Sequence, residues 1–179
     1  MNTRNNKKRK LSQDKIEKVF IKLIQKYEIN EISVSDICKL AEINRSTFYA
    51  NYLDIYDLAD KVKEKMFHDF LELYQEEKVL KKHSYNYLPM FTDIKNNQIF
   101  YKTLFKLNFD FSQYYDKHLE YEESIKFLGT TKNIDYHIEF FTAGIIAIIK
   151  KWLYNGCKES PEEMVEILNL EYKGKSLDF

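Results

Sequence analysis

The sequence contains few of the residues that interrupt regular backbone structure. It has 4 glycines and 2 prolines among 179 residues. This scarcity argues against a loop-rich or all-β design, because such folds need many turn residues. Two cysteines, Cys38 and Cys157, are too few for a disulfide framework, and both fall in expected helices. We interpret them as small buried side chains.

Long apolar runs and targeting signals are also missing. The longest apolar stretch, residues 140–149, is about half of the ~20 residues that a membrane-spanning helix needs. The basic run at residues 7–10 is followed by an amphipathic pattern and not by the apolar core of a signal peptide. We therefore expect a cytoplasmic protein with no membrane partner.

The sequence shows no motif for catalysis or for cofactor binding. It has no nucleophile elbow, glycine-rich phosphate loop, HExxH motif or paired-cysteine metal site. The four histidines lack metal-ligand spacing: His68, His83, His118 and His137. We therefore predict a protein that is not an enzyme and that binds neither a cofactor nor a metal.

The net charge of zero conceals an uneven distribution. The first 26 residues hold nine basic and two acidic side chains, a net charge of +7, so the remaining chain carries −7. A basic end on an otherwise acidic protein suits a polyanionic partner. A disordered, solubilising tail would give the same charge run.

Helical periodicity of apolar residues predicts an all-α fold. Capping residues mark the starts of four helices in the N-terminal part of the chain: Ser12, Ser33, Asn44 and Asp54. Two further helices are expected at 135–154, followed by a glycine stop at Gly156, and at 161–170, after Ser160. Residues 1–11 are expected to be a disordered basic arm.

Residues 33–52 are the most informative segment. They read as two short helices joined by a tight turn, and the second carries small polar groups, an arginine and tyrosines. Such a helix can enter the major groove of DNA, whose base edges display a specific pattern of donors and acceptors. The residues from Arg45 to Tyr52, with Ile37 and Ala41 before them, closely resemble the DNA-binding segment of the TetR/AcrR family of bacterial transcription regulators.

This resemblance implies a helix-turn-helix DNA-binding domain at residues 12–53 and a helical dimerisation and ligand-binding domain at 54–179. It implies that Phe48 turns into the core and that eight residues meet bases or phosphates: Ser33, Ser35, Asn44, Arg45, Ser46, Thr47, Tyr49 and Asn51. Arg45 could contact either guanine or a phosphate. The alternative is that residues 33–52 are core helices without any DNA contact.

Two positions depart from the family pattern. Glu42 stands where the turn usually has glycine, and a left-handed backbone there would cost roughly 1–2 kcal/mol. Ile55 stands where a lysine commonly opens the next helix. Both changes weaken the attraction for DNA, and we expect the arm from Arg4 to Lys10 to compensate, along the backbone or in a minor groove.

The C-terminal part carries a second resemblance, through residues 140–156 and Ser160–Met164, to a TetR subgroup related to regulators of dihydroxyacetone-kinase operons. Residues 140–149 are apolar nearly all round, so a second copy of the chain is the natural cover. The predicted dimer interface consists of Phe141, Gly144, Ile145, Ile148, Trp152, Met164 and Leu168. The alternative is that these residues are intramolecular core.

Aromatic residues are dense between Phe67 and Tyr121. They could be plain core, or they could line a pocket for a small-molecule effector. The predicted pocket residues are Phe67, Phe70, Tyr74, Tyr101 and Phe105. The predicted function is a ligand-responsive repressor that binds a palindromic operator in double-stranded DNA as a homodimer. The alternative is a DNA-binding co-activator or adaptor, whose C-terminal domain binds a protein partner instead of a small molecule.

Overall fold

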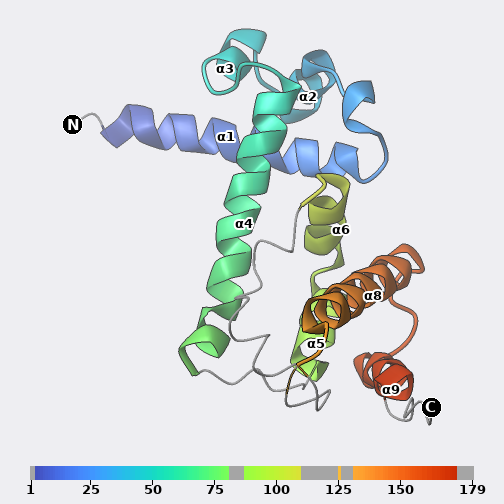
Figure 1. Ribbon diagram of the computed structural model, residues 1–179. Coiled ribbons are helices and arrows are strands. Elements are labelled where there is room, and N and C mark those ends of the chain that lie inside the picture. The colour runs from blue at the N-terminus through green and yellow to red at the C-terminus, as the bar shows by residue number, and fades with distance from the viewer. Residues whose placement is uncertain (1–2, 81–86, 110–124, 126–130, 173–179) are drawn as a thin grey trace. The chain divides into compact units, whose positions relative to one another are not determined.

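The computed structural model describes residues 3–80, 87–109, 125 and 131–172 (Figure 1). In these ranges the regular elements are all helices, which confirms the predicted all-α fold. No helix in them is long and apolar enough to span a membrane. The chain forms two compact units: Met1–Glu72 with Thr103–Phe109, and Leu73–Lys102 with Asp110–Phe179.

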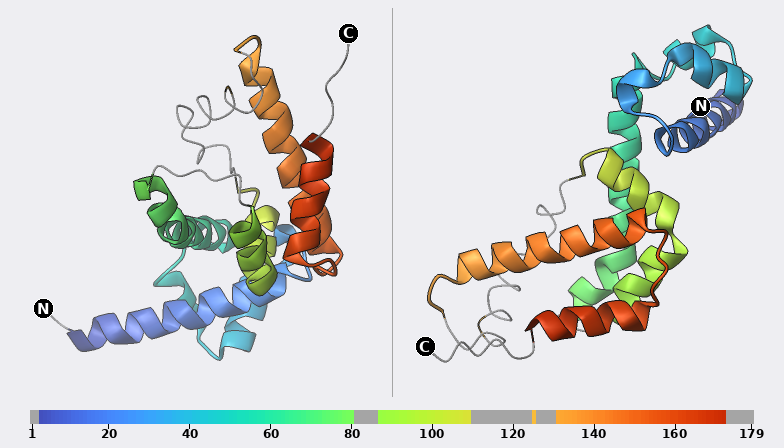
Figure 2. Two further views of the ribbon diagram at one scale, coloured as in Figure 1. Left: turned by 90° about the horizontal axis from the view of Figure 1, so that it is seen from below. Right: turned by 90° about the vertical axis from the view of Figure 1, so that its right-hand side faces the viewer.

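The first unit contains α1 (Thr3–Ile24), the short 3-10 helix η1 (Ile29–Glu31), α2 (Val34–Ala41), α3 (Arg45–Tyr49) and the first part of α4 (Ile55–Leu80). Helices α2 and α3 pack against α1 and lie on the same side of it (Figures 1 and 2). Their shared core consists of fully buried side chains, which include Ile16, Phe20, Ile37, Phe48 and Leu58.

Helix α1 begins at Thr3, although we expected residues 1–11 to be disordered and Ser12 to cap the helix. The hydroxyl of Ser12 instead donates to the carbonyl of Lys8 at 3.1 Å, a bond inside a continuing helix. Residues 3–24 contain neither proline nor glycine, so nothing in the sequence stops a helix once the core-packed part has nucleated it. The basic segment is therefore a helical extension of α1.

The turn between α2 and α3 has a left-handed residue at Glu42, with φ 54° and ψ 51°. Its backbone N–H closes α2 by donating to the carbonyl of Cys38. The family's usual glycine would adopt this conformation without strain, whereas the Cβ of Glu42 opposes it. Asn44 precedes α3 as expected, but its side chain makes no capping hydrogen bond.

The second unit contains α5 (Leu88–Asn96), the first residues of α6 (Gln98–Lys106), α8 (Ile134–Tyr154) and α9 (Pro161–Tyr172). Helix α5 packs against α9, and the ring of Phe91 meets the ring of Trp152 edge-on at 5.5 Å. The predicted end of α8 and start of α9 are confirmed. Gly156 is left-handed after α8, and Ser160 and Glu163 form a reciprocal capping box at the start of α9.

Glu42→Gly is expected to raise the free energy of unfolding by about 1 kcal/mol, because glycine removes the left-handed strain. Chemical denaturation of the full chain measures this change. The matched control is Glu64→Gly, which places glycine at an exposed position inside α4 and should lower the free energy of unfolding by about 1 kcal/mol. Equal losses in both variants would show that Glu42 is unstrained.

Candidate nucleic-acid interface

Helix α3 presents a polar face to solvent because Phe48 anchors its other side. The ring of Phe48 is fully buried, as predicted, and Tyr49 packs edge-on against it with ring centroids 5.5 Å apart. Four of the predicted DNA-facing residues are therefore exposed: Asn44, Arg45, Ser46 and Tyr49. Thr47 is half-buried. A helix of five residues with this composition can offer both charge and hydrogen-bonding groups to a groove.

The start of α2 contributes the serines that we expected to meet phosphates. Ser33 and Ser35 are both exposed. The hydroxyl oxygen of Ser33 accepts from the backbone N–H of Asp36 at 3.1 Å, which confirms Ser33 as the cap. The Ser33 hydroxyl also bonds to the Asp36 carboxylate, so Ser35 has the freer hydroxyl of the two.

An open concavity of about 470 Å³ lies beside these elements and is lined by Ser12, Cys38, Lys39, Glu42, Ile43, Asn44 and Thr47. It brings the turn residue Glu42 next to two predicted DNA-facing residues, Asn44 and Thr47. Burial raises the pKa of the Cys38 thiol, which favours its protonated form.

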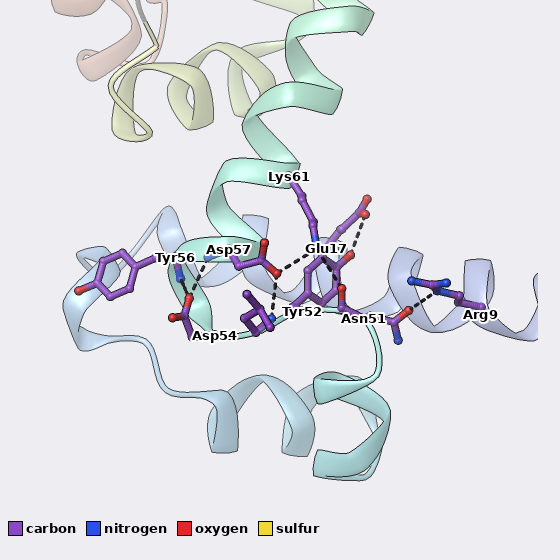
Figure 3. Close-up of polar contacts among 9 residues, drawn as sticks. Arg9, Glu17, Asn51, Tyr52, Asp54, Tyr56, Asp57 and Lys61 are labelled. Carbon is purple, nitrogen blue, oxygen red and sulfur yellow. Dashed lines mark hydrogen bonds and ion pairs between the residues drawn. The ribbon is translucent and has the colours of Figure 1, made fainter.

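Asn51 does not fit the DNA contact that the sequence predicted for it. Its side chain is buried, and both ends of its amide are bonded inside the protein. Figure 3 shows the bond to Arg9. The nitrogen Nδ2 donates to the carbonyl of Thr47 at 2.8 Å, and Oδ1 accepts from Nε of Arg9 at 3.2 Å. Asn51 therefore ties α3 to the basic start of α1.

Glu17 joins three segments of the first unit. It accepts from the hydroxyl of Tyr52 at 3.0 Å and from Nζ of Lys65 at 2.6 Å. Burial and the Glu17 carboxylate raise the pKa of Tyr52 well above its ordinary value, so the phenol remains a donor. Sequence reasoning missed this cluster because its members lie far apart in the chain and follow no motif.

The start of α4 is closed by its own carboxylates. Asp54 Oδ1 accepts from the backbone N–H groups of Tyr56 and Asp57 at 2.8 and 2.9 Å, and Asp57 Oδ2 accepts from that of Leu53 at 2.8 Å. Ile55, which replaces the family's lysine, is buried. A phosphate at this helix start would therefore meet bound carboxylates instead of free N–H groups.

Comparisons with known proteins agree with this arrangement. A family model described as the C-terminal region of a transcriptional regulator, TetR_C_8, matches residues 64–170. The HTH-type dhaKLM operon transcriptional activator DhaS of Lactococcus lactis subsp. lactis (strain IL1403) is 30% identical over 133 residues, covering 74% of this chain and 70% of that protein. The chain belongs to the TetR family of transcriptional regulators. Both resemblances noted in the sequence are thereby confirmed.

A solved structure of the dihydroxyacetone kinase operon activator DhaS shows 24% identity to this chain. The match covers 90% of this chain and 96% of that one, with a TM-score of 0.49.

Four of the residues predicted for the dimer interface of this TetR-family chain are buried within the single chain: Ile145, Trp152, Met164 and Leu168. Phe141, Gly144 and Ile148 are half-buried. The large apolar groups that α8 leaves exposed lie elsewhere, at Tyr136, Phe140 and Tyr154. Sequence periodicity could not find this face, because α8 is apolar nearly all round.

The structure describes the side chains of three of the five predicted pocket residues. Phe67 and Phe105 belong to the first unit, where the Phe67 ring packs 5.5 Å from that of Phe109. Tyr101 belongs to the second unit, where it is buried and its hydroxyl bonds to Asp93. Phe70 and Tyr74 are part of α4, but their side chains lie outside the described residues.

Asp57→Asn is expected to lower the melting temperature at neutral pH. The backbone N–H of Leu53 and the ammonium of Lys61 hold the pKa of Asp57 below its ordinary value of 3.8. A carboxyl with a lowered folded-state pKa stabilises the fold above that ordinary value, and the stabilisation is lost as pH falls through the folded-state pKa. The difference between wild type and variant should therefore shrink as the pH is taken below 3.8.

Thermal unfolding followed across this pH range tests the expectation. The matched control is Asp60→Asn on the same helix, whose exposed carboxylate lies 3.6 Å from Lys63 and caps no backbone group among the described residues. A constant difference at all pH values would contradict the role assigned to the Asp57 charge.

Proposed function

We propose that the chain is a DNA-binding transcription regulator that inserts α3 into the major groove. The observation that carries this proposal is the outward face of α3, where Arg45 is exposed and has no hydrogen-bond or ion-pair partner among the described residues. An exposed arginine without such a partner can contact bases or phosphates without first breaking a bond within the protein. Tyr49 beside it is also exposed.

We also propose that it acts as a homodimer on a palindromic operator. Tyr136, Phe140, Ala143, Ala147 and Tyr154 share one side of α8 because they are three, four or seven residues apart. A Cβ added at Gly144 would meet nothing within 4 Å, so the described part of the chain leaves this stretch of α8 uncovered. Covering an apolar helix face with a second copy would also pair two α3 helices for two half-sites.

The direction of regulation favours the second of the two predicted functions. The sequence predicted a ligand-responsive repressor, with a co-activator as the alternative. The Lactococcus relative is named a transcriptional activator. This name supports the alternative of an activator, whose C-terminal unit would bind a protein partner. A reporter gene under the chain's selected binding sequence would rise with an activator and fall with a repressor.

Arg45→Ala and Tyr49→Ala are each expected to weaken binding to the duplex that the wild type selects from a random-sequence pool. Removing one specific interaction with a base costs about 1–3 kcal/mol, roughly 5- to 150-fold in affinity. The measurement is a gel-shift titration. The matched control is Tyr27→Ala, an exposed tyrosine after α1, which should bind as the wild type does. Unchanged binding by both variants would remove these residues from the interface.

Phe140→Glu is expected to shift the chain from dimer to monomer, because it places a charge at the centre of the proposed interface. Phe140 is 78% exposed in the single chain, so its replacement should leave the protomer folded. Sedimentation equilibrium measures the mass. Leu53→Glu is the control, since Leu53 is 79% exposed and lies outside α8. A dimer that persists in Phe140→Glu would exclude this face.

A further inference from the structure

The first residues of α1 form a strongly basic helix with little to hold it in place. Residues 3–11 contain five cations and no acidic side chain: Arg4, Lys7, Lys8, Arg9 and Lys10. Residues 6–11 are all exposed, and the first buried side chain of α1 is Ile16. Figures 1 and 2 show the start of α1 extending beyond α2 and α3.

This segment works against helix formation when no partner is present. The N-terminus of a helix carries partial positive charge, so cations there are unfavourable. The first turn of α1 contains no acidic residue to offset them. A polyanion alongside the segment would remove both the dipole conflict and the repulsion between neighbouring lysines. The charge pattern therefore matches a phosphate backbone.

Two side-chain hydrogen bonds connect this segment to α3. Arg9 donates through Nε to Oδ1 of Asn51 at 3.2 Å (Figure 3). Asn51 in turn donates through Nδ2 to the carbonyl of Thr47 at 2.8 Å. Because Arg9 uses only Nε in this bond, its two terminal amino groups have no partner among the described residues. These groups have the fork geometry that binds phosphate.

We propose that residues 3–11 are a second DNA-contacting element, which binds the phosphate backbone beside the groove that α3 enters, and that Asn51 is the residue that positions it. This inference rests on the proposed DNA-binding function. Lys8 and Lys10 flank Arg9 on the helix, about 100° to either side of it. The element supplies salt-dependent affinity on one side of α3, while the Asp54 and Asp57 carboxylates close the start of α4.

The salt dependence of binding tests this element. The probe is the duplex selected by the wild-type full chain, titrated at several salt concentrations. Lys8→Gln/Lys10→Gln should lower the slope of log K against log salt by about 0.9 for each phosphate that the variant no longer neutralises. Lys18→Gln/Lys22→Gln removes the same charge from exposed positions of the same helix and should keep the wild-type slope. Equal slopes for both double variants overturn the proposal.

A double-mutant cycle tests the positioning role of Asn51. In an Asn51→Ala background, Lys8→Gln/Lys10→Gln should reduce the slope by less than it does in the wild type, since the segment is no longer held against α3. Additive changes overturn this role. Arg9→Gln breaks the same bond from the exposed side, so it provides the background if Asn51→Ala does not fold.

DNA binding and the role of the basic helix fail in different ways. A wild-type chain that selects no duplex overturns DNA binding and this inference together. If binding depends on Arg45 but the salt dependence is unchanged in Lys8→Gln/Lys10→Gln, the proposed function stands. Only the role proposed for residues 3–11 is then overturned.

Discussion

Burial of Phe48 is the constraint on which the exposed face of α3 depends. Helix α3 has five residues, far too few to be stable alone, so packing must impose its helical conformation. Phe48 supplies that packing from within the helix, and its ring lies 5.7 Å from that of Tyr52. Tyr52 is in turn held by Glu17, which also binds Lys65 of α4. The direction of every exposed side chain on α3 follows from this buried anchor.

The same unit distributes its charges unevenly around α3. On one side, Asp54 and Asp57 satisfy the N–H groups at the start of α4, and Lys61 donates to Asp57 and to the carbonyl of Asn51. These bonds stabilise the helix start and neutralise its nearest cation. On the other side, α1 begins with a run of cations that Arg9 links to α3 through Asn51. The positive charge beside α3 therefore lies at the start of α1 and not at the start of α4.

In the second unit, packing within the chain decides which apolar groups remain for a partner. Trp152 and Met164 are buried in the chain's own core, where Phe91 meets Trp152. The side of α8 that carries Phe140 receives no such cover from the described residues. A helix that is apolar nearly all round could bury any of several faces, and the positions of α5 and α9 decide which face of α8 is buried. The residues named from sequence for an interface and for a pocket therefore stay predictions.

The sequence by itself determined the helical fold, the family, the burial of Phe48, and the caps at Ser33, Asp54 and Ser160, because these depend on periodicity and on residues within one or two turns. Tertiary structure alone decided the rest. The Arg9–Asn51 bond spans 42 residues and Glu17–Lys65 spans 48, and no local pattern predicts either. The helix at residues 3–11 was also missed, since its charge predicts disorder while its attachment to a packed α1 propagates the helix. Short-range rules fix where helices start and stop, whereas long-range contacts decide which polar groups remain free to bind.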